Sequence, residues 1–202
     1  GAPFFSEDFE NLDQGSLTAL GDAGWLVFGN EFDPDTGDNL NAYGPNPAPN
    51  NPAAPAFSLI AAGEGGVTQG AQQLTILSDY QNRPAQTAGD LVEANTYQEN
   101  TFQPADSGKT LTFSFDAKKG NIADDSTAFA FIKTLEAAPS FALIDFEQLD
   151  TTNLPTEWMR YSVTLAIRED LVGQLFQFGF AATATNDEPS GVFYDNVEVT
   201  IE

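Results

Sequence analysis

Four segments of the chain alternate hydrophobic and polar residues with a period of two, which is the pattern of strands buried on one face. These segments are residues 111–117, 158–167, 174–181 and 192–199. Clusters rich in Gly, Asn and Pro lie between strands, as at 119–121 and 186–191, and supply the backbone angles that chain reversals need. Short strands separated by turns predict an all-β fold, and we expect a jelly-roll β-sandwich of two antiparallel sheets.

Residues 33–55 break this pattern. Five prolines fall between positions 45 and 55, and proline can neither donate to a sheet ladder nor continue a helix. We therefore expect a long Pro/Asn-rich loop near 33–55, of a length usually associated with binding or with disorder. Residues 145–150 and 169–172 are candidates for single helical turns.

The chain has 202 residues, of which 41% are hydrophobic and 17 are phenylalanine. This is enough apolar material for one large sheet-on-sheet core. The segment before residue 33 is too short to fold by itself without disulfides or metals. We therefore expect one domain over residues 1–202, and a monomer.

The chain carries 7 Lys and Arg against 30 Asp and Glu, a formal net charge of −23. So negative a protein is repelled by phosphate backbones and by anionic lipid, and we expect neither nucleic acid nor a membrane as a partner. The same charge suits a secreted protein in salty media, where screening weakens self-repulsion. We therefore expect an extracellular protein.

Cysteine and histidine are both absent. Their absence excludes disulfides, thiolate or imidazole metal sites, and catalytic triads that use either residue. Carboxylates are so numerous that an acid/base pair for glycoside cleavage can be drawn from almost any two strands, so no pair stands out. We expect no enzymatic activity.

Each end of the chain carries a carboxylate on a strand pattern, Glu10 near the start and Asp195 near the end. A sandwich that pairs its first and last strands brings these two groups together, and they repel unless a cation lies between them. Calcium prefers such oxygen ligands, so we expect a structural Ca²⁺ at Glu10 and Asp195. The acidic turn at 33–39 also resembles a calcium loop but lacks the distal glutamate, so a second site and a plain turn both stay open.

Five motifs, in their order and spacing, resemble the galactose-binding-like jelly rolls, especially carbohydrate-binding modules of the family 4, 9 and 22 type. They are Asp8-Phe9-Glu10, Gly24-Trp25, and residues 111–117, 156–165 and 193–197. Residues 43–80 also look like modules found in polysaccharide-degrading proteins of marine bacteria. The resemblance implies a structural calcium near the joined termini and a glycan site on one concave face or at the loop end. It assigns Glu10 and Asp195 to the calcium, with Asp8 as a third candidate, and Asn196 replaces an aspartate common in the family.

Aromatic residues in polar, loop-like sequence are candidates for stacking on sugar rings, with amide and guanidinium groups beside them for the hydroxyls. The candidates are Tyr43, Tyr80, Tyr97 and Trp25 for stacking, with Arg83 and Gln98 as hydrogen-bonding partners. A core position is an alternative for each ring, and Trp25 in particular lies in an apolar context.

We therefore expect a non-catalytic module that binds a neutral polysaccharide, because the charge of the chain opposes acidic ones. Laminarin-type β-1,3-glucan is the first candidate ligand, ahead of xylan, mannan and mixed-linkage glucan. A place beside a catalytic domain in a longer protein is a further expectation. The alternatives are an extracellular structural or adhesive spacer without a glycan site, and a jelly-roll lyase or hydrolase.

Overall fold

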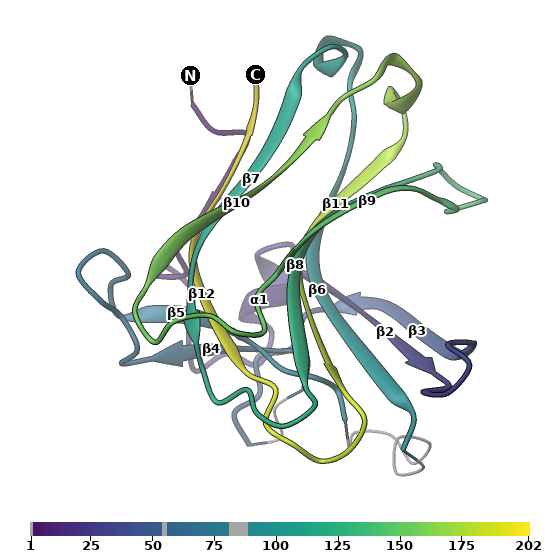
Figure 1. Ribbon diagram of the computed structural model, residues 1–202. Coiled ribbons are helices and arrows are strands. Elements are labelled where there is room, and N and C mark those ends of the chain that lie inside the picture. Colours follow the sequence, from purple (N-terminus) through teal and green to yellow (C-terminus); the bar gives the residue numbers. More distant parts are fainter. Residues whose placement is uncertain (1, 54–55, 81–88) are drawn as a thin grey trace.

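The computed structural model of the protein describes residues 2–53, 56–80 and 89–202 and confirms the predicted β-sandwich: two antiparallel sheets of six strands each (Figure 1). Sheet 1 contains, in order, β10 (Met159–Ala166), β7 (Thr110–Lys119), β12 (Val192–Ile201), β5 (Gln72–Ile76) and β4 (Ser58–Ala62), with β1 (Phe5–Glu7) also paired to β12. Sheet 2 contains β3 (Asn39–Pro47), β2 (Leu26–Phe32), β6 (Leu91–Thr101), β11 (Leu175–Ala184), β8 (Thr127–Leu135) and β9 (Leu143–Asp150). The four segments predicted from their alternation correspond to β7, β10, β11 and β12.

The first and last strands pair with each other, as expected from the sequence. Phe5 lies opposite Val199 and Glu7 opposite Val197 in an antiparallel ladder. Strand β12 also pairs with β7 along both of its halves and with β5 at its start. The two ends of the chain therefore lie at the same end of the molecule (Figure 1).

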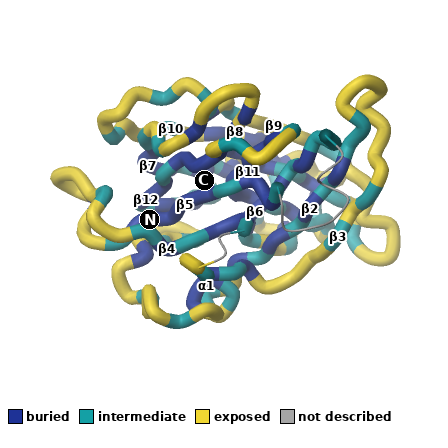
Figure 2. Tube along the Cα trace, turned by 90° about the horizontal axis from the view of Figure 1, so that it is seen from below, coloured by how far each residue is buried: buried dark blue, intermediate teal, exposed yellow. Residues whose placement is uncertain are grey.

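Aromatic side chains fill the space between the sheets. On β11, Phe176, Phe178 and Phe180 alternate toward the core, where all three are buried. Phe180 stacks on Tyr194 of β12 with ring centroids 3.7 Å apart, and Phe113 of β7 lies 5.5 Å from Phe178. Burying each ring contributes about 1.5–3 kcal/mol, so this layer dominates the packing of the two sheets. Figure 2 shows the buried strands enclosed by exposed turns.

Two segments differ from the sequence-based expectation. Within the expected loop at 33–55, residues 39–47 form strand β3. β3 lies at the edge of sheet 2, where Pro45 and Pro47 need no partner on the open side, so proline is tolerated there. Residues 145–150 belong to strand β9 instead of a helical turn. Both edge strands are largely exposed, so neither shows the one-sided hydrophobic alternation that identifies an interior strand.

The described residues contain three short helical segments: α1 (Ala19–Asp22), η2 (Pro104–Asp106) and η3 (Glu169–Leu171). The last lies where a helical turn was expected. Within residues 2–53, 56–80 and 89–202, no helix is both long and apolar enough to span a bilayer.

Replacing Tyr194 by Phe should destabilise the fold by about 1–2 kcal/mol, because the buried hydroxyls of Thr151 and Tyr194 lie 2.6 Å apart and the change leaves Thr151 unpaired. Urea unfolding monitored by circular dichroism measures the loss. The double variant Tyr194→Phe/Thr151→Val removes both polar groups and should recover part of the stability. Equal stability of wild type and Tyr194→Phe would show that this hydrogen bond contributes nothing.

Candidate functional site

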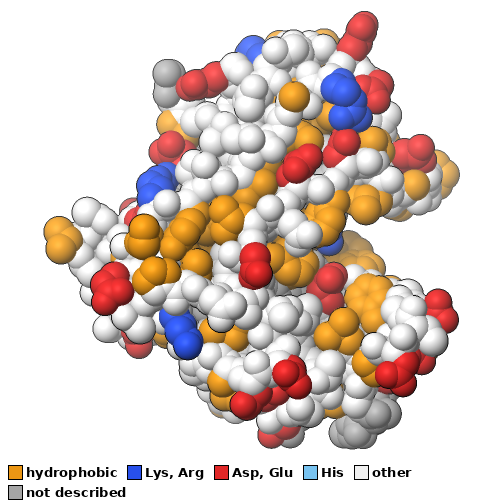
Figure 3. Space-filling model, viewed as in Figure 1, with side chains coloured by type: hydrophobic (Ala, Val, Ile, Leu, Met, Phe, Trp, Pro, Cys, Tyr) orange, Lys and Arg blue, Asp and Glu red, His pale blue; other side chains and the backbone are white. Residues whose placement is uncertain are grey.

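A groove of about 630 Å³ crosses the outer face of sheet 2. Its floor comes from β2, β6, β11 and β8, and its two walls are the β3 edge, at Gly44 and Pro45, and the β8–β9 hairpin, at Phe141 and Leu143. Figure 3 shows the surface hollowed between the β2–β3 and β8–β9 hairpins, with hydrophobic side chains along the hollow. The groove therefore runs across the strands of sheet 2.

The floor is set by the alternation of the interior strands. Because Phe176, Phe178 and Phe180 point into the core, Gln177 and Gly179 of β11 point outward. Strand pairing places Gln177 between Glu99 of β6 and Lys133 of β8. Gln177 Nε2 donates a hydrogen bond to Glu99 Oε2 over 2.8 Å. A row of polar side chains thus crosses the middle of the groove.

A glycine lets β11 lie close to β6 beside the Tyr97 position. A Cβ at Gly179 would clash with the Thr96 carbonyl oxygen and lie 2.6 Å from Tyr97 Cα, so no side chain fits there. Tyr97 packs with Phe131 and Ala181 in a small apolar cluster on the outer face of sheet 2, separate from the main core. Burial raises the pKa of the Tyr97 hydroxyl, with a smaller contribution from Glu99, so this ring stays neutral.

The β8–β9 hairpin presents apolar side chains above this floor. Phe141, Leu143 and Phe146 are 54%, 56% and 39% exposed, although each is large and hydrophobic. Exposed apolar groups gathered on one wall of a groove are typical of a binding surface. The rings of this wall are available to a ligand, whereas those of the floor are largely covered.

Lys133 is the cation of the groove. Its Nζ lies 4.6 Å from the centroid of the Phe131 ring and 5.3 Å from that of Phe146. Its one hydrogen bond to a described residue is a long one, 3.5 Å to Asn95 Oδ1. Burial lowers the pKa of Lys133, and the negative charge of Glu93 partly opposes this. The ammonium group therefore has donors left for a ligand.

The structure places one of the expected sugar-binding residues, Tyr97, in the groove. Trp25 is fully buried in the main core, so its assignment as a ligand contact was wrong. Gln98 points away from the groove and donates to the carbonyl of Ala23 over 3.1 Å, because it alternates with Tyr97 along β6. It is a structural residue.

The other three expected residues do not join Tyr97. Tyr43 lies on the interior side of sheet 2, where its ring covers Gly29, and its hydroxyl donates to Asp79 Oδ2 over 2.7 Å. Tyr80 is half-buried and lies outside the groove lining. Arg83 lies outside the described residues. Tyr43 therefore does not face the groove, and the ligand contacts expected at Tyr80 and Arg83 stay predictions.

Sequence reasoning missed Phe28, Lys133, Phe141 and Phe146. The signal was present in residues 129–133, Phe-Ala-Phe-Ile-Lys, which place aromatic rings on the outward face of β8 and only aliphatic residues on the core face. Aromatic rings on the outward face of an interior strand indicate a surface that packs against something outside the core, such as a ligand. The hairpin residues gave no such signal, because their position depends on the turn that carries them.

A second polar cluster lies on the outer face of sheet 1, beside the joined termini. Asp195 is fully buried, and one of its oxygens, Oδ2, accepts no hydrogen bond from the described residues. Burial raises the pKa of Asp195 to about 8; a hydrogen bond from the Asn196 amide lowers it, and the charges of Glu10, Asp116 and Asp8 raise it further. The sequence-predicted carboxylates of residues 8, 10 and 195 therefore do share one electrostatic environment.

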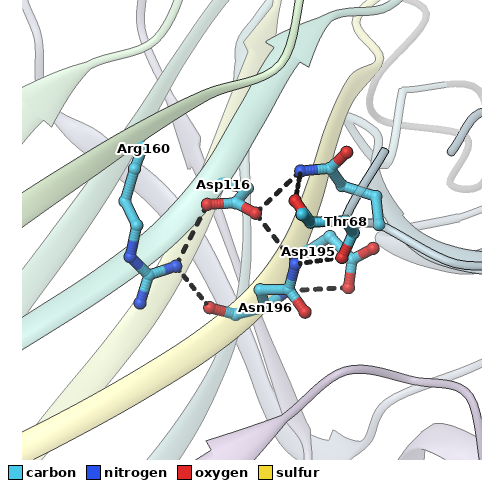
Figure 4. Close-up of polar contacts among 6 residues, drawn as sticks. Thr68, Asp116, Arg160, Asp195 and Asn196 are labelled. Atoms are coloured by element: carbon cyan, nitrogen blue, oxygen red, sulfur yellow. Dashed lines mark hydrogen bonds and ion pairs between the residues drawn. The ribbon is translucent and has the colours of Figure 1, made fainter. Parts of the chain in front are cut away.

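Local hydrogen bonds hold this cluster in place. Glu10 accepts from the backbone amides of Ala71 and Gln72 at 3.1 and 2.8 Å. Asp116 lies opposite Asp195 in the β7–β12 ladder and binds Arg160 of β10 over 3.1 Å (Figure 4). Arg160 thus compensates Asp116, while Asp195 and Glu10 face no cationic side chain among the ion pairs of the described residues. No group of three or more acidic residues in the described part of the chain has the spacing of a metal site.

No model of a known protein family matches the chain, and no curated protein is significantly similar to it. Several solved structures share its fold. One is a structure described as the structural basis for the promiscuous specificity of carbohydrate-binding modules from the β-sandwich superfamily. Its sequence is 13% identical and its TM-score is 0.50; the match covers 96% of this chain and 60% of that chain. Another is the CBM22-2 xylan-binding domain of Paenibacillus barcinonensis Xyn10C, with 14% identity, a TM-score of 0.54, and coverage of 98% and 99%.

A third solved structure is the Stig cyclase Fisc from Fischerella sp. TAU, in complex with an indole compound, with 13% identity, a TM-score of 0.55, and coverage of 97% and 93%. At such identities these comparisons establish the fold, and neighbours of the same fold include both binding modules and an enzyme. The chain thus has the β-sandwich fold of family 22 and related carbohydrate-binding modules.

Proposed function

We propose that the protein binds a neutral polysaccharide, without cleaving it, in the groove on sheet 2. The observation that carries this proposal is the combination of an exposed aromatic ring on one wall, Phe141, with a row of hydrogen-bonding side chains on the floor, such as Gln177 and Lys133. Sugar rings present C–H groups that pack on aromatic faces and hydroxyls that need donors and acceptors.

The charges of the groove favour a neutral ligand. Glu93 and Glu99 of β6 lie on its floor side, and Lys133 is the one cation that lines the groove within the described residues. The whole chain adds a net charge of −23, so an acidic polysaccharide meets repulsion at long range and at contact. The hydroxyl groups of a neutral polysaccharide can donate hydrogen bonds to these carboxylates without electrostatic repulsion.

Laminarin-type β-1,3-glucan is our first ligand, and xylan is the second. The xylan-binding domain among the structural neighbours supports including xylan. Such polymers lie outside cells, so the proposed function places the protein in the extracellular medium, as a module beside a catalytic domain or alone.

The groove does not suit glycoside hydrolysis. Glu93 and Glu99 lie on the same strand six residues apart, a separation of roughly 20 Å at about 3.3 Å per residue. Glycosidases hold their two carboxyl groups about 5–9.5 Å apart. Both side chains also accept hydrogen bonds, Glu93 from Asn30 and Asn95, and Glu99 from Gln177. These acids are placed for binding.

We also propose a structural Ca²⁺ at Glu10 and Asp195. The buried Oδ2 of Asp195 lacks a hydrogen bond from the described residues, the charge of Glu10 acts on this carboxyl group, and neither acid has a cationic partner among the ion pairs of the described residues. Oxygen ligands of this kind fit calcium, with backbone carbonyls and water completing the set. Asp8 is the weaker candidate, because its Oδ1 accepts from the Glu10 amide. The bound ion would supply positive charge to the joined ends of the chain.

Removing the exposed ring of Phe146, whose centroid lies 5.3 Å from Lys133 Nζ at the edge of the groove, should weaken binding of laminarin or xylan by up to about tenfold, since an aromatic contact contributes about 0.5–1.5 kcal/mol. Affinity electrophoresis in gels that contain each polymer measures the change. Leu143→Ala in the groove wall should weaken binding less, and Leu40→Ala is its matched control, because Leu40 is 53% exposed on β3 and lies outside the groove lining.

Retardation by none of the neutral polymers would contradict the proposed function and favour the spacer. Release of sugar from any polymer, or turnover by the wild type that Phe146→Ala loses, would instead indicate an enzyme. Stronger retardation by alginate or another acidic polymer would contradict the choice of a neutral ligand.

Chelation should lower the melting temperature of the protein, because an ion that binds only the folded state stabilises it by about 2.7 kcal/mol at a hundred times its dissociation constant. Differential scanning calorimetry with Ca²⁺ and with chelator measures the shift. The variants Glu10→Gln and Asp195→Asn should melt at the same temperature in both. A wild-type melting temperature that chelator leaves unchanged would contradict the site.

In chelator, stability should depend on pH through Asp195. Its pKa is about 8 in the folded protein against an ordinary value of 3.8, so the folded state holds the proton more tightly. The contribution of this group is therefore fully present below about pH 4 and is lost as pH rises to about 8, by at most about 1.4 kcal/mol per pH unit. Urea unfolding of wild type against Asp195→Asn across this range isolates the effect, and parallel curves would contradict it.

A further inference from the structure

A second concavity, of about 570 Å³, lies on the outer face of sheet 1, on the opposite side of the sandwich from the groove. It is bounded by the start of β10, the middle of β12, the end of β1 and residues 68–69. Its volume is within the range of about 300–1,000 Å³ that small-molecule sites occupy. The proposed function makes no use of it.

The guanidinium of Arg160 is fixed at one end and open at the other. Its Nη1 donates to Asp116 Oδ1 over 3.1 Å and to the carbonyl of Asn196 over 2.9 Å. Its Nε and Nη2 make no hydrogen bond to any residue in the described ranges, and the side chain is 47% exposed. Figure 4 shows the bonded end directed at Asp116 and Asn196 and the other end directed away. An oriented pair of donors therefore faces the concavity.

A β-bulge creates this arrangement. The register of β12 against β7 shifts between Asp195 and Glu198, and Asn196 takes a left-handed backbone conformation with a φ of 45°. The bulge turns the Asn196 carbonyl toward Arg160, while Asn196 Nδ2 donates to Asp116 Oδ2 and to the carbonyl of Thr68 over 2.8 and 2.9 Å. Bulges that re-aim groups in this way are enriched beside functional sites.

An aromatic ring lies beside the open donors. Trp158, two residues before Arg160, is half-buried and lines the concavity. Its Nε1 donates to the carbonyl of Glu64 over 2.9 Å, and Lys118 Nζ lies 5.4 Å from its ring centroid, so the ring is held in one orientation. Met159, 50% exposed, extends the apolar surface. A rigid apolar platform is thus adjacent to a bidentate donor.

The remaining wall is acidic. Glu7, Asp8 and Glu198 line the concavity, whereas the charge of Arg160 is already balanced by Asp116. None of these three acids is in an ion pair between described residues, so a carboxylate or phosphate ligand would meet three negative charges, which opposes its entry. Hydroxyl groups fit both walls, because they accept from guanidinium N–H groups and donate to carboxylates.

We propose that this concavity is a second binding site, specific for a neutral polyhydroxylated ring such as a single sugar residue or a chain end. Arg160 Nε and Nη2 donate to two adjacent hydroxyl oxygens, Glu7 and Glu198 accept from hydroxyls, and Trp158 contacts the C–H face of the ring. The choice of a sugar among polyols rests on the proposed function of the groove. With both sites occupied, the two faces of the sandwich bind separate chains, or distant parts of one chain, and increase avidity.

Tryptophan fluorescence tests this site apart from the groove. The chain has two tryptophans, of which Trp25 is fully buried, and the groove lining within the described residues contains neither. Titration with glucose, xylose, mannose, galactose, laminarihexaose and xylohexaose should give a saturable change in tryptophan emission for at least one sugar. Arg160→Lys keeps the charge beside Asp116 but removes the fork, and should weaken this binding by about tenfold or more. Phe146→Ala, in the groove, should leave it unchanged.

Three results would overturn the proposal: no saturable change with any of these sugars, equal affinity in wild type and Arg160→Lys, or loss of the signal in Phe146→Ala. Tighter binding of glucuronate or galacturonate than of the neutral sugars would overturn the stated specificity. If Arg160→Lys lowers the melting temperature, Glu7→Gln provides the second variant, with severalfold weaker binding expected. Groove binding without a tryptophan signal would leave the proposed function intact and remove this site.

Discussion

The inward packing of the phenylalanines on β11 is the constraint on which the groove depends. This strand lies in the interior of sheet 2 and pairs along nearly its whole length with β6 and β8. Because Phe178 and Phe180 point into the core, Gln177 and Gly179 between them point outward. The pairing register then fixes which residues of the neighbouring strands face outward beside them. A shift by one residue would bring polar groups into the core and phenylalanines into the groove. The chemistry of the outer face is therefore fixed by the stability of the inner one.

Sheet 1 differs from sheet 2 in that it carries buried acidic side chains. Arg160, Asp116 and Asp195 lie in one row across β10, β7 and β12. The arginine compensates the nearer carboxylate and leaves the farther one, together with Glu10, short of positive charge. Buried carboxylates without partners are costly, and proteins retain such groups mainly where a ligand or ion meets them. The bulge at Asn196 serves this row too, since it turns a carbonyl and an amide toward its members.

The sequence was informative wherever one face of a strand is buried. Alternation identified β7, β10, β11 and β12, and the resemblance to jelly-roll modules implied that the first and last strands meet. It failed at β3 and β9, because an edge strand exposed on both faces has no reason to alternate. It failed also for the ligand-facing rings: Trp25 and Tyr43 lie in the interior, whereas Phe141 lines the groove from a hairpin and Phe146 lies beside Lys133. Which ring faces solvent depends on tertiary pairing, and composition around a tyrosine does not reveal it.

The pairing of β1 with β12 has a mechanical consequence. The ladder begins next to the chain ends, where the Phe4 amide donates to the Val199 carbonyl over 2.8 Å, and runs from there toward Glu7. Tension applied between the two ends loads these hydrogen bonds one after another, as in unzipping, instead of all together in shear. Strand β12 stays held by β7, so β1 peels first. Because Glu7 and Asp8 form a wall of the concavity around Arg160, a pull on the chain ends would open that wall before it disturbs the core or the groove on the other sheet.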